Sequence, residues 1–175
     1  LHYYTGTGTL ATKFNESQWF NTIRNALRLE ELINKNLQIM NTFIPNADID
    51  LVVDEWGCWH KVEPGTRPGF LYQQNTMRDA ILAGLSLNIF NNHSDKVKMA
   101  NIAQTANVLQ AMVLTNEEKV ILTPTYHVFD MFQVHHDATY LFLQLNSHKY
   151  TFNEEEIPAV TGSASMDKKG KVHIT

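Results

Sequence analysis

The sequence predicts an α/β fold, with parallel β-α-β units up to about residue 135 and antiparallel sheet after it. In the first part, short runs of β-branched and apolar residues alternate with two long helical patterns, as in parallel sheets that are covered by helices. In the last part, ATYLFLQL, IPAVTGSAS and KVHIT follow one another without a helical segment between them. We therefore divide the chain into residues 1–135 and an incomplete second domain over residues 136–175.

The first predicted elements are a strand and a long helix. The strand lies in the aromatic, β-prone run LHYYT, and a Thr/Gly-rich loop follows it. Asn15 can cap the helix while Gln18 reaches back to the cap, which is a known signal for a helix start. The apolar stripe of this helix stops at Pro45, because proline cannot continue a helix.

The next elements complete the alternation of strands and helices. Residues 49–55 predict a short buried strand, and residues 57–69, rich in Pro and Gly, predict a loop. A second helix is expected from about residue 73 to residue 90, where apolar residues fall four apart. The run VKMANIAQ at residues 97–104 predicts the following strand.

Composition and charge narrow the classes of function. The 175 residues carry a net charge of -4 with a pI near 6.0, and no basic face of the kind that binds nucleic acid is apparent. We expect no membrane partner, since no apolar run is long enough to span a bilayer. Cys58 is the one cysteine, which fits a reducing compartment, and a cytoplasmic or periplasmic location is favoured. Both ends fall within strand-like runs, so we expect a longer protein.

Two carboxylates follow directly on the apolar residues of the run LVVDEWGCWH, namely Asp54 and Glu55. In parallel α/β barrels the catalytic groups sit at the carboxyl ends of the strands. A carboxylate beside tryptophans suits a sugar site, where it attacks an anomeric carbon. Alternatively, Asp54 caps the loop, Glu55 pairs with an arginine and the tryptophans belong to the core. These residues alone leave both interpretations open.

Two other predicted strands also carry polar side chains near the expected sheet edge. His2 and Tyr4 share one face of the first strand, because a strand has a period of two residues. A tyrosine hydroxyl beside a carboxylate can stabilise the ionised form by hydrogen bonding. Gln104, at the end of VKMANIAQ, offers an amide for sugar hydroxyls. The three strand ends together favour a carbohydrate site more than any one of them does.

Four separated blocks of the sequence carry a family resemblance. VVDEWGCW, LYQQNTMRDAILAGLSLNIF, VKMANIAQTANVLQAM and LTPTYHVFDMF resemble, in this order, the C-terminal half of glycoside hydrolase family 51, the α-L-arabinofuranosidases. The resemblance implies the C-terminal part of a (β/α)8 barrel, about strands 6 to 8, followed by the start of an antiparallel β-sandwich. It also implies that Glu55 is the nucleophile of a retaining enzyme. The residues that would line the sugar site are His2, Tyr4, Trp59 and Gln104.

The implied activity is the removal of terminal arabinofuranosyl units from hemicellulose or pectin side chains, and thus from arabinose-containing oligo- or polysaccharides. No metal or organic cofactor is implied. Retention needs a second carboxyl group about 5 to 5.5 Å from the nucleophile, which the resemblance places upstream of Leu1. We therefore expect the remainder of the same protein, the N-terminal barrel half, as a partner, together with a homo-oligomer. The segment alone should be inactive. The alternative is a non-catalytic carbohydrate-binding or assembly module.

Other clusters favour structural roles. Adjacent histidines, as at His135 and His136, point in different directions, so we do not expect them to form a metal site with Asp137. The basic run DKKGK at residues 167–171 is more typical of a hairpin turn than of a binding patch. Glu154–Glu156 is expected in a charged linker and offers no replacement for the missing acid. Gly57 stands where many relatives of the resembled family have Asn.

Overall fold

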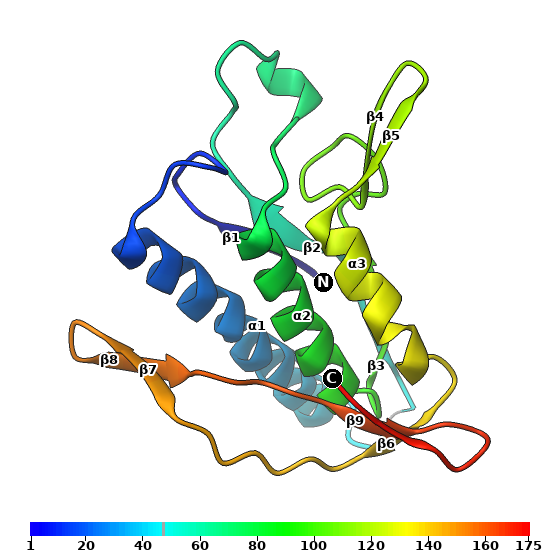
Figure 1. Cartoon of the computed structure of the whole chain (residues 1–175). Coiled ribbons are helices and arrows are strands. Elements are labelled where there is room, and N and C mark those ends of the chain that lie inside the picture. Colours follow the sequence, from blue (N-terminus) through cyan, green and yellow to red (C-terminus); the bar gives the residue numbers. More distant parts are fainter. Residues whose placement is uncertain (47) are drawn as a thin grey trace.

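The computed structural model describes residues 1–46 and 48–175. Its central sheet has three strands in the order β1-β2-β3, and both pairings are parallel. The strands are β1 (His2–Gly6), β2 (Leu51–Trp59) and β3 (Val97–Ile102). Two long helices connect them, lying side by side over one face of the sheet (Figure 1). These helices are α1 (Glu16–Phe43) and α2 (Met77–Asn92). The predicted parallel β-α-β units are confirmed.

The first helix begins and ends as its sequence signals predict. The Asn15 side chain accepts a hydrogen bond from the Gln18 amide, and the Gln18 side chain accepts one from the Asn15 amide. This reciprocal pair satisfies two of the free amides at the helix start. The helix ends at Phe43, two residues before Pro45. Its buried face carries mainly apolar residues: Phe20, Thr22, Ile23, Ala26, Leu29 and Ile33.

The second helix begins later than the apolar spacing predicts. Thr76 caps it in a reciprocal box with Asp79, so the helix begins at Met77 rather than near residue 73. It packs between α1 and α3 (Pro124–Phe132), and most of its residues are buried. None of the described helices combines the length and the apolarity needed to cross a membrane.

Strand β2 extends further than predicted. It runs to Trp59 rather than residue 55, because β1 pairs along it as far as the Gly6–Trp59 pair. The following loop therefore starts later, and it contains a short 3-10 helix, η1 (Pro68–Phe70). Strand β3 is shorter than predicted and ends at Ile102, so Gln104 lies two residues beyond it.

The last third of the chain contains short antiparallel pairs of strands in addition to α3 and a short 3-10 helix. The hairpin of β4 (Val113–Asn116) and β5 (Lys119–Leu122) was not predicted. After α3 and the short η2 (Gln133–His135), β6, β9 and β10 form an antiparallel sheet in the order β10-β9-β6, and β7 pairs with β8. Their bounds are Thr139–Leu141 for β6, Lys149–Phe152 for β7, Glu155–Pro158 for β8, Ala164–Met166 for β9 and Val172–Ile174 for β10.

Two predictions for charged segments have different outcomes. The run DKKGK does form the turn between β9 and β10, where the Asp167 amide donates to the Lys171 carbonyl at 2.9 Å. The prediction of a charged linker at Glu154–Glu156 is wrong. Glu155 begins β8 after a tight turn at Asn153–Glu154, because residues 149–152 and 155–158 pair as a hairpin.

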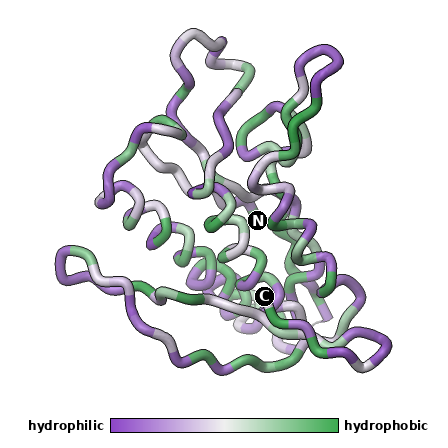
Figure 2. The backbone as a smooth tube through the Cα atoms, viewed as in Figure 1, coloured by the Kyte–Doolittle hydropathy of each residue, from purple (hydrophilic) through white to green (hydrophobic). Residues whose placement is uncertain are grey.

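The β7–β8 hairpin packs against α1. Tyr150 and Phe152 contact Phe20 of α1, with ring centroids 5.3 and 5.5 Å apart. Arg24 of α1 pairs with Glu155. One apolar cluster therefore includes residues from both sides of the predicted boundary at residue 135. Figure 2 shows apolar residues along the elements that meet in this cluster and hydrophilic residues at the hairpin tips.

Candidate functional site

The candidate site lies where the first residues of β1 pair with the middle of β2, level with the carboxyl end of β3. His2 is the direct register partner of Glu55 in the neighbouring strand. The Tyr4 hydroxyl donates a hydrogen bond of 2.7 Å to Glu55 Oε2, and His2 Nδ1 lies 3.6 Å from the same oxygen. The period of two residues in β1 puts both side chains on the face that the Glu55 carboxylate occupies. The structure thus brings together three of the five predicted residues.

The protonation state of Tyr4 suits its role as a donor. Partial burial raises the pKa of Tyr4 well above its ordinary value, and the hydrogen bond to Glu55 and the charge of that carboxylate raise it further. The hydroxyl therefore keeps its proton at neutral pH. A charge-assisted hydrogen bond of this kind is about twice as strong as one between neutral groups, so Tyr4 fixes the orientation of Glu55.

The second carboxylate of the run, Asp54, also lies close to His2. His2 Nε2 is 3.9 Å from Asp54 Oδ2. The imidazole therefore lies between two acidic side chains. Its surroundings are open, since the side chain of Glu55 is 45% exposed and that of Asp54 59% exposed.

The two tryptophans that flank Glu55 have different surroundings. Trp59 is 38% exposed, and its ring meets Tyr4 edge to face at 5.0 Å between centroids. Trp56 is buried between Phe90 and Phe129. Trp56 therefore belongs to the core, as the structural alternative holds, and Trp59 alone offers an indole face beside Glu55.

Gln104 is the fifth predicted residue and lies apart from the other four. It is exposed and lines a hollow of about 480 Å³ together with Phe70, Tyr72 and neighbouring residues. The adjacent Ala103 amide donates to the Trp56 carbonyl at 2.9 Å, which keeps this segment, just past the carboxyl end of β3, beside the middle of β2. Gln104 thus shares the sheet edge with Glu55, without a contact to it.

A buried polar cluster behind Trp59 was missed by the sequence analysis. His60 Nε2 lies 3.0 Å from Asp79 Oδ1, and both side chains are fully buried. Arg78 Nη2 lies 3.0 Å from His60 Nδ1. A guanidinium can only donate, so Nδ1 accepts and Nε2 carries the proton that is shared with Asp79. The run TMRD, a capping box, was the available signal, since it places Arg78 and Asp79 in the first turn of α2.

The buried arginine also ties together the loop after β1. Its Nη1 donates to Thr9 Oγ1 at 3.1 Å and its Nη2 to the Leu10 carbonyl at 3.1 Å. The guanidinium lies 4.0 Å from the ring centroid of Phe14. Burial lowers the pKa of Arg78 from its ordinary value, but a guanidinium stays charged at neutral pH.

Cys58, His60 and Asp79 are close enough together to be considered as metal ligands. Their geometry does not fit this role. Cys58 Sγ lies 3.6 Å from Nε2 and 3.9 Å from Nδ1 of His60, so the sulfur lies over the ring face rather than on the line of either lone pair. Burial, followed by the charge of Asp79, raises the pKa of the thiol well above its ordinary value. Both oxygens of the Asp79 carboxylate are already engaged, by His60 and by the amide and hydroxyl of Thr76.

Of the paired histidines after α3, His135 connects this segment to the C-terminal sheet, and His136 is exposed. His135 Nδ1 is 2.7 Å from Ser165 Oγ, and His135 Nε2 is 2.7 Å from Thr175 Oγ1. Both ring nitrogens are thus engaged by the C-terminal sheet. Burial lowers the pKa of His135. The predicted structural role is confirmed for this residue.

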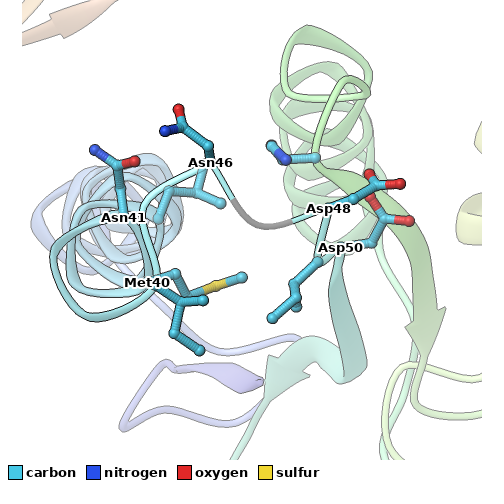
Figure 3. Close-up of a pocket in the computed structure, with 9 residues that line it drawn as sticks. Met40, Asn41, Asn46, Asp48 and Asp50 are labelled. Atoms are coloured by element: carbon cyan, nitrogen blue, oxygen red, sulfur yellow. The ribbon is translucent and has the colours of Figure 1, made fainter.

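A cavity of about 770 Å³ lies at the opposite end of β2, where α1 leads into the strand (Figure 3). Asp48 and Asp50 lie on one side of it and Asn41 and Asn46 on the other. The predicted site residues do not line this cavity.

Comparisons with known proteins show the family of this chain. A family model described as the α-L-arabinofuranosidase C-terminal domain matches residues 54–174. The intracellular exo-α-L-arabinofuranosidase of Bacteroides ovatus is 46% identical over 181 residues, which cover 100% of this chain and 35% of that protein. The GH51 arabinofuranosidase of Xanthomonas axonopodis pv. citri has a TM-score of 0.95 at 48% identity, over 99% of this chain and 36% of that one.

A more distant structure shares the fold alone. The α-L-arabinofuranosidase of Thermotoga maritima, solved as an arabinose complex, gives a TM-score of 0.75 at 21% identity, over 99% of this chain and 36% of its own. The chain therefore spans about a third of the length of the relatives it matches. These relatives are glycoside hydrolases in which the matching region is part of a larger protein. The chain belongs to the GH51 α-L-arabinofuranosidases, and it matches their C-terminal domain.

Proposed function

We propose that this chain is part of a retaining, exo-acting α-L-arabinofuranosidase and that Glu55 is its nucleophile. The observation that carries the proposal is the hydrogen bond of 2.7 Å from the Tyr4 hydroxyl to Glu55 Oε2. It orients a carboxylate in the middle of β2, level with the carboxyl end of β3, and the ring of the partly exposed Trp59 contacts the same tyrosine. An oriented carboxylate next to an indole suits attack on a sugar held against the ring.

The two oxygens of Glu55 would have different tasks. Tyr4 and His2 both approach Oε2, so we assign the attack on the anomeric carbon to Oε1. A covalent glycosyl ester forms there while the glycosidic C–O bond breaks, and a second carboxyl group protonates the leaving oxygen. That group then accepts a proton from water, which attacks the ester and releases arabinose. His2, Trp59 and Gln104 would line the sugar site.

The second carboxyl group would come from the remainder of the protein. Among the described residues, β1 and β3 each pair with β2 alone, so both edges of the sheet are free to pair. In a (β/α)8 barrel these edges are closed by the remaining strands. We propose that β1, β2 and β3 are about the sixth to eighth strands of such a barrel and that the C-terminal strands begin a β-sandwich. Assembly into homo-oligomers stays a prediction.

A carbohydrate-binding or assembly role without catalysis is the second candidate. It is favoured by the openness of the site, where the side chain of Glu55 is 45% exposed. An indole face and polar side chains on an open surface can hold a sugar without cleaving it. The two candidates differ in whether Glu55 is needed for turnover or only for binding.

The test is the hydrolysis of 4-nitrophenyl α-L-arabinofuranoside by the complete protein and by its Glu55→Gln variant. We expect turnover to fall by at least about 1,000-fold, because no covalent intermediate can form, while arabinose still binds. The matched control is Asp54→Asn, which alters the neighbouring carboxylate of the same strand and should keep most of the activity. With Glu55→Ala, added azide should restore turnover by attacking the anomeric carbon from the vacated position. Equal turnover in Glu55→Gln and wild type would exclude the proposed nucleophile.

A further inference from the structure

The carboxyl end of β2 lacks a strand partner on the side of β3. The last paired residues are Trp56 and Ile102, and the Ala103 amide adds one hydrogen bond to the Trp56 carbonyl. Because successive residues of a strand direct their backbone groups to opposite sides, the groups of Cys58 and His60 face the same way as those of Trp56. Buried backbone groups must find hydrogen-bond partners, and beyond Trp56 the neighbouring strand supplies none in the described chain.

Two buried glutamines supply the partners. Gln73 Nε2 donates to the Cys58 carbonyl at 2.9 Å, and Gln73 Oε1 accepts from the His60 amide at 3.0 Å. A single amide that spans residues i and i+2 reproduces the two bonds that a parallel strand would make there. Gln110 Oε1 accepts from the Cys58 amide at 2.7 Å. Gln73 is 3% exposed and Gln110 is 0% exposed.

The side-chain amide of Gln110 is itself held in place by hydrogen bonds that its nitrogen donates. Its Nε2 donates to the Asp79 carbonyl at 2.7 Å and to Thr125 Oγ1 at 3.1 Å. On the strand side, Gln110 packs against Gly57, where a Cβ would lie 3.4 Å from Gln110 Oε1 and 3.5 Å from the Ala103 carbonyl, both ordinary van der Waals contacts. The φ of +151° at Gly57 favours glycine.

The backbone that these amides hold is that of Trp59. Cys58 and His60 flank it, and its own carbonyl accepts from the Thr7 amide at 3.0 Å on the β1 side. Trp59 is thereby fixed from both sides, although its ring is partly exposed. The ring contacts Tyr4 at 5.0 Å, so its position also determines its distance from Glu55.

We propose that Gln73 and Gln110 are positioning residues for the indole face of Trp59, an inference that rests on the proposed function of the site. The two amides replace a missing strand and hold the sugar platform rigid at the end of β2. If the Trp59 ring is mobile, the enzyme should bind the substrate more weakly. Its binding of the transition state should weaken by a similar factor. The constant KM then rises while kcat changes little. A purely structural role would instead lower the folded fraction, which reduces kcat and leaves KM unchanged.

The test compares Gln73→Met with wild type in the complete enzyme. Met keeps the length of the side chain and removes the amide. We expect KM for 4-nitrophenyl α-L-arabinofuranoside to rise about 10-fold, with kcat within about 3-fold. L-Arabinose, followed by tryptophan fluorescence, should bind about 10-fold more weakly. The matched control is Gln74→Met at the exposed neighbouring position, which should leave both constants unchanged.

A second variant keeps the proposal testable if Gln73→Met does not fold. In Gln73→Glu the side chain can still accept from the His60 amide, but its second oxygen faces the Cys58 carbonyl. When that carboxyl is protonated it can donate to the carbonyl, so the KM ratio of variant to wild type should fall between about pH 7 and about pH 5. A ratio independent of pH, or an unchanged KM and arabinose affinity in Gln73→Met, would overturn the inference.

Failure of the proposed function would give a different result. If wild type does not cleave the substrate, the proposed hydrolase is refuted, and arabinose binding alone then decides the positioning role. Weaker arabinose binding in Gln73→Met but not in Gln74→Met would support it. Equal binding in wild type and both variants would refute it.

Discussion

Replacing Asp79 by Asn tests whether the buried cluster behind Trp59 depends on a carboxylate. Asp79 Oδ2 accepts from the Thr76 amide and hydroxyl, both at 2.8 Å, and Oδ1 accepts from His60 Nε2 at 3.0 Å. Asn has nearly the same shape but offers only one acceptor oxygen. With that oxygen toward Thr76, its amide group faces the donor on His60. A flipped His60 tautomer would direct a donor at Arg78, so no arrangement satisfies every group.

Three overlapping terms determine the expected loss in the free energy of unfolding of Asp79→Asn. A lost hydrogen bond to a charged group costs about 1.5–3 kcal/mol, and a buried donor without a partner costs about 1–3 kcal/mol. Arg78 would also lose the favourable charge of Asp79, which acts across the His60 ring and not in direct contact. The loss of about 3–5 kcal/mol on breaking a direct buried ion pair is therefore an upper bound for this term. Because these terms describe the same contacts, we expect a total loss of about 4 kcal/mol rather than their sum. This is a large part of the stability of an ordinary domain, which is about 5–15 kcal/mol.

The assay is unfolding in guanidinium chloride followed by circular dichroism, with the free energy of unfolding obtained by linear extrapolation. The matched control is Asp95→Asn, since Asp95 follows the same helix but is exposed. Its free energy of unfolding should stay within about 0.5 kcal/mol of wild type. A loss below about 1 kcal/mol in Asp79→Asn would refute the reasoning, because it would mean that His60 and Arg78 are satisfied without the carboxylate.

Two further predictions concern Tyr4 and the His93–Glu30 pair. In Tyr4→Phe the ring contact with Trp59 remains and the hydrogen bond to Glu55 is lost, so we expect kcat to fall about 10-fold, which corresponds to about 1.4 kcal/mol; an unchanged kcat in steady-state kinetics would contradict an orienting role. The hydrogen bond of 2.6 Å that His93 Nε2 donates to the Glu30 carboxylate raises the pKa of His93 above its unfolded value. Its stabilising effect is therefore complete below about pH 6.5 and lost as the pH rises through the raised folded value. Since the Glu30 side chain is partly exposed, Glu30→Gln should cost about 0.5 kcal/mol near pH 6 and almost nothing near pH 9, as measured by unfolding at the two pH values; an equal cost at both would exclude the ion pair as its cause.

Local sequence patterns were sufficient to predict much of the course of the main chain. Asn15 and Gln18 identified the start of α1 because a capping box acts within four residues. The parallel order of β1 and β2, with the two-residue period of β1, was enough to expect His2 and Tyr4 near Glu55. The turn at residues 167–171 was equally local. In each case the physical cause lies within a few residues of its effect.

Contacts between distant segments could not be read in this way. Arg78 and Thr9 are 69 positions apart in the sequence, and Gln110 and Cys58 are 52 positions apart. A local sequence pattern covers far fewer residues, so it cannot predict either contact. The length of β2 was underestimated for the same reason, since its last residues are strand only because Gly6 pairs with Trp59. The sequence by itself determined the order of strands and helices and the residues available for chemistry, through periodicity and caps. Only the tertiary structure decided which polar groups are buried together, because desolvation depends on what the rest of the fold places around them.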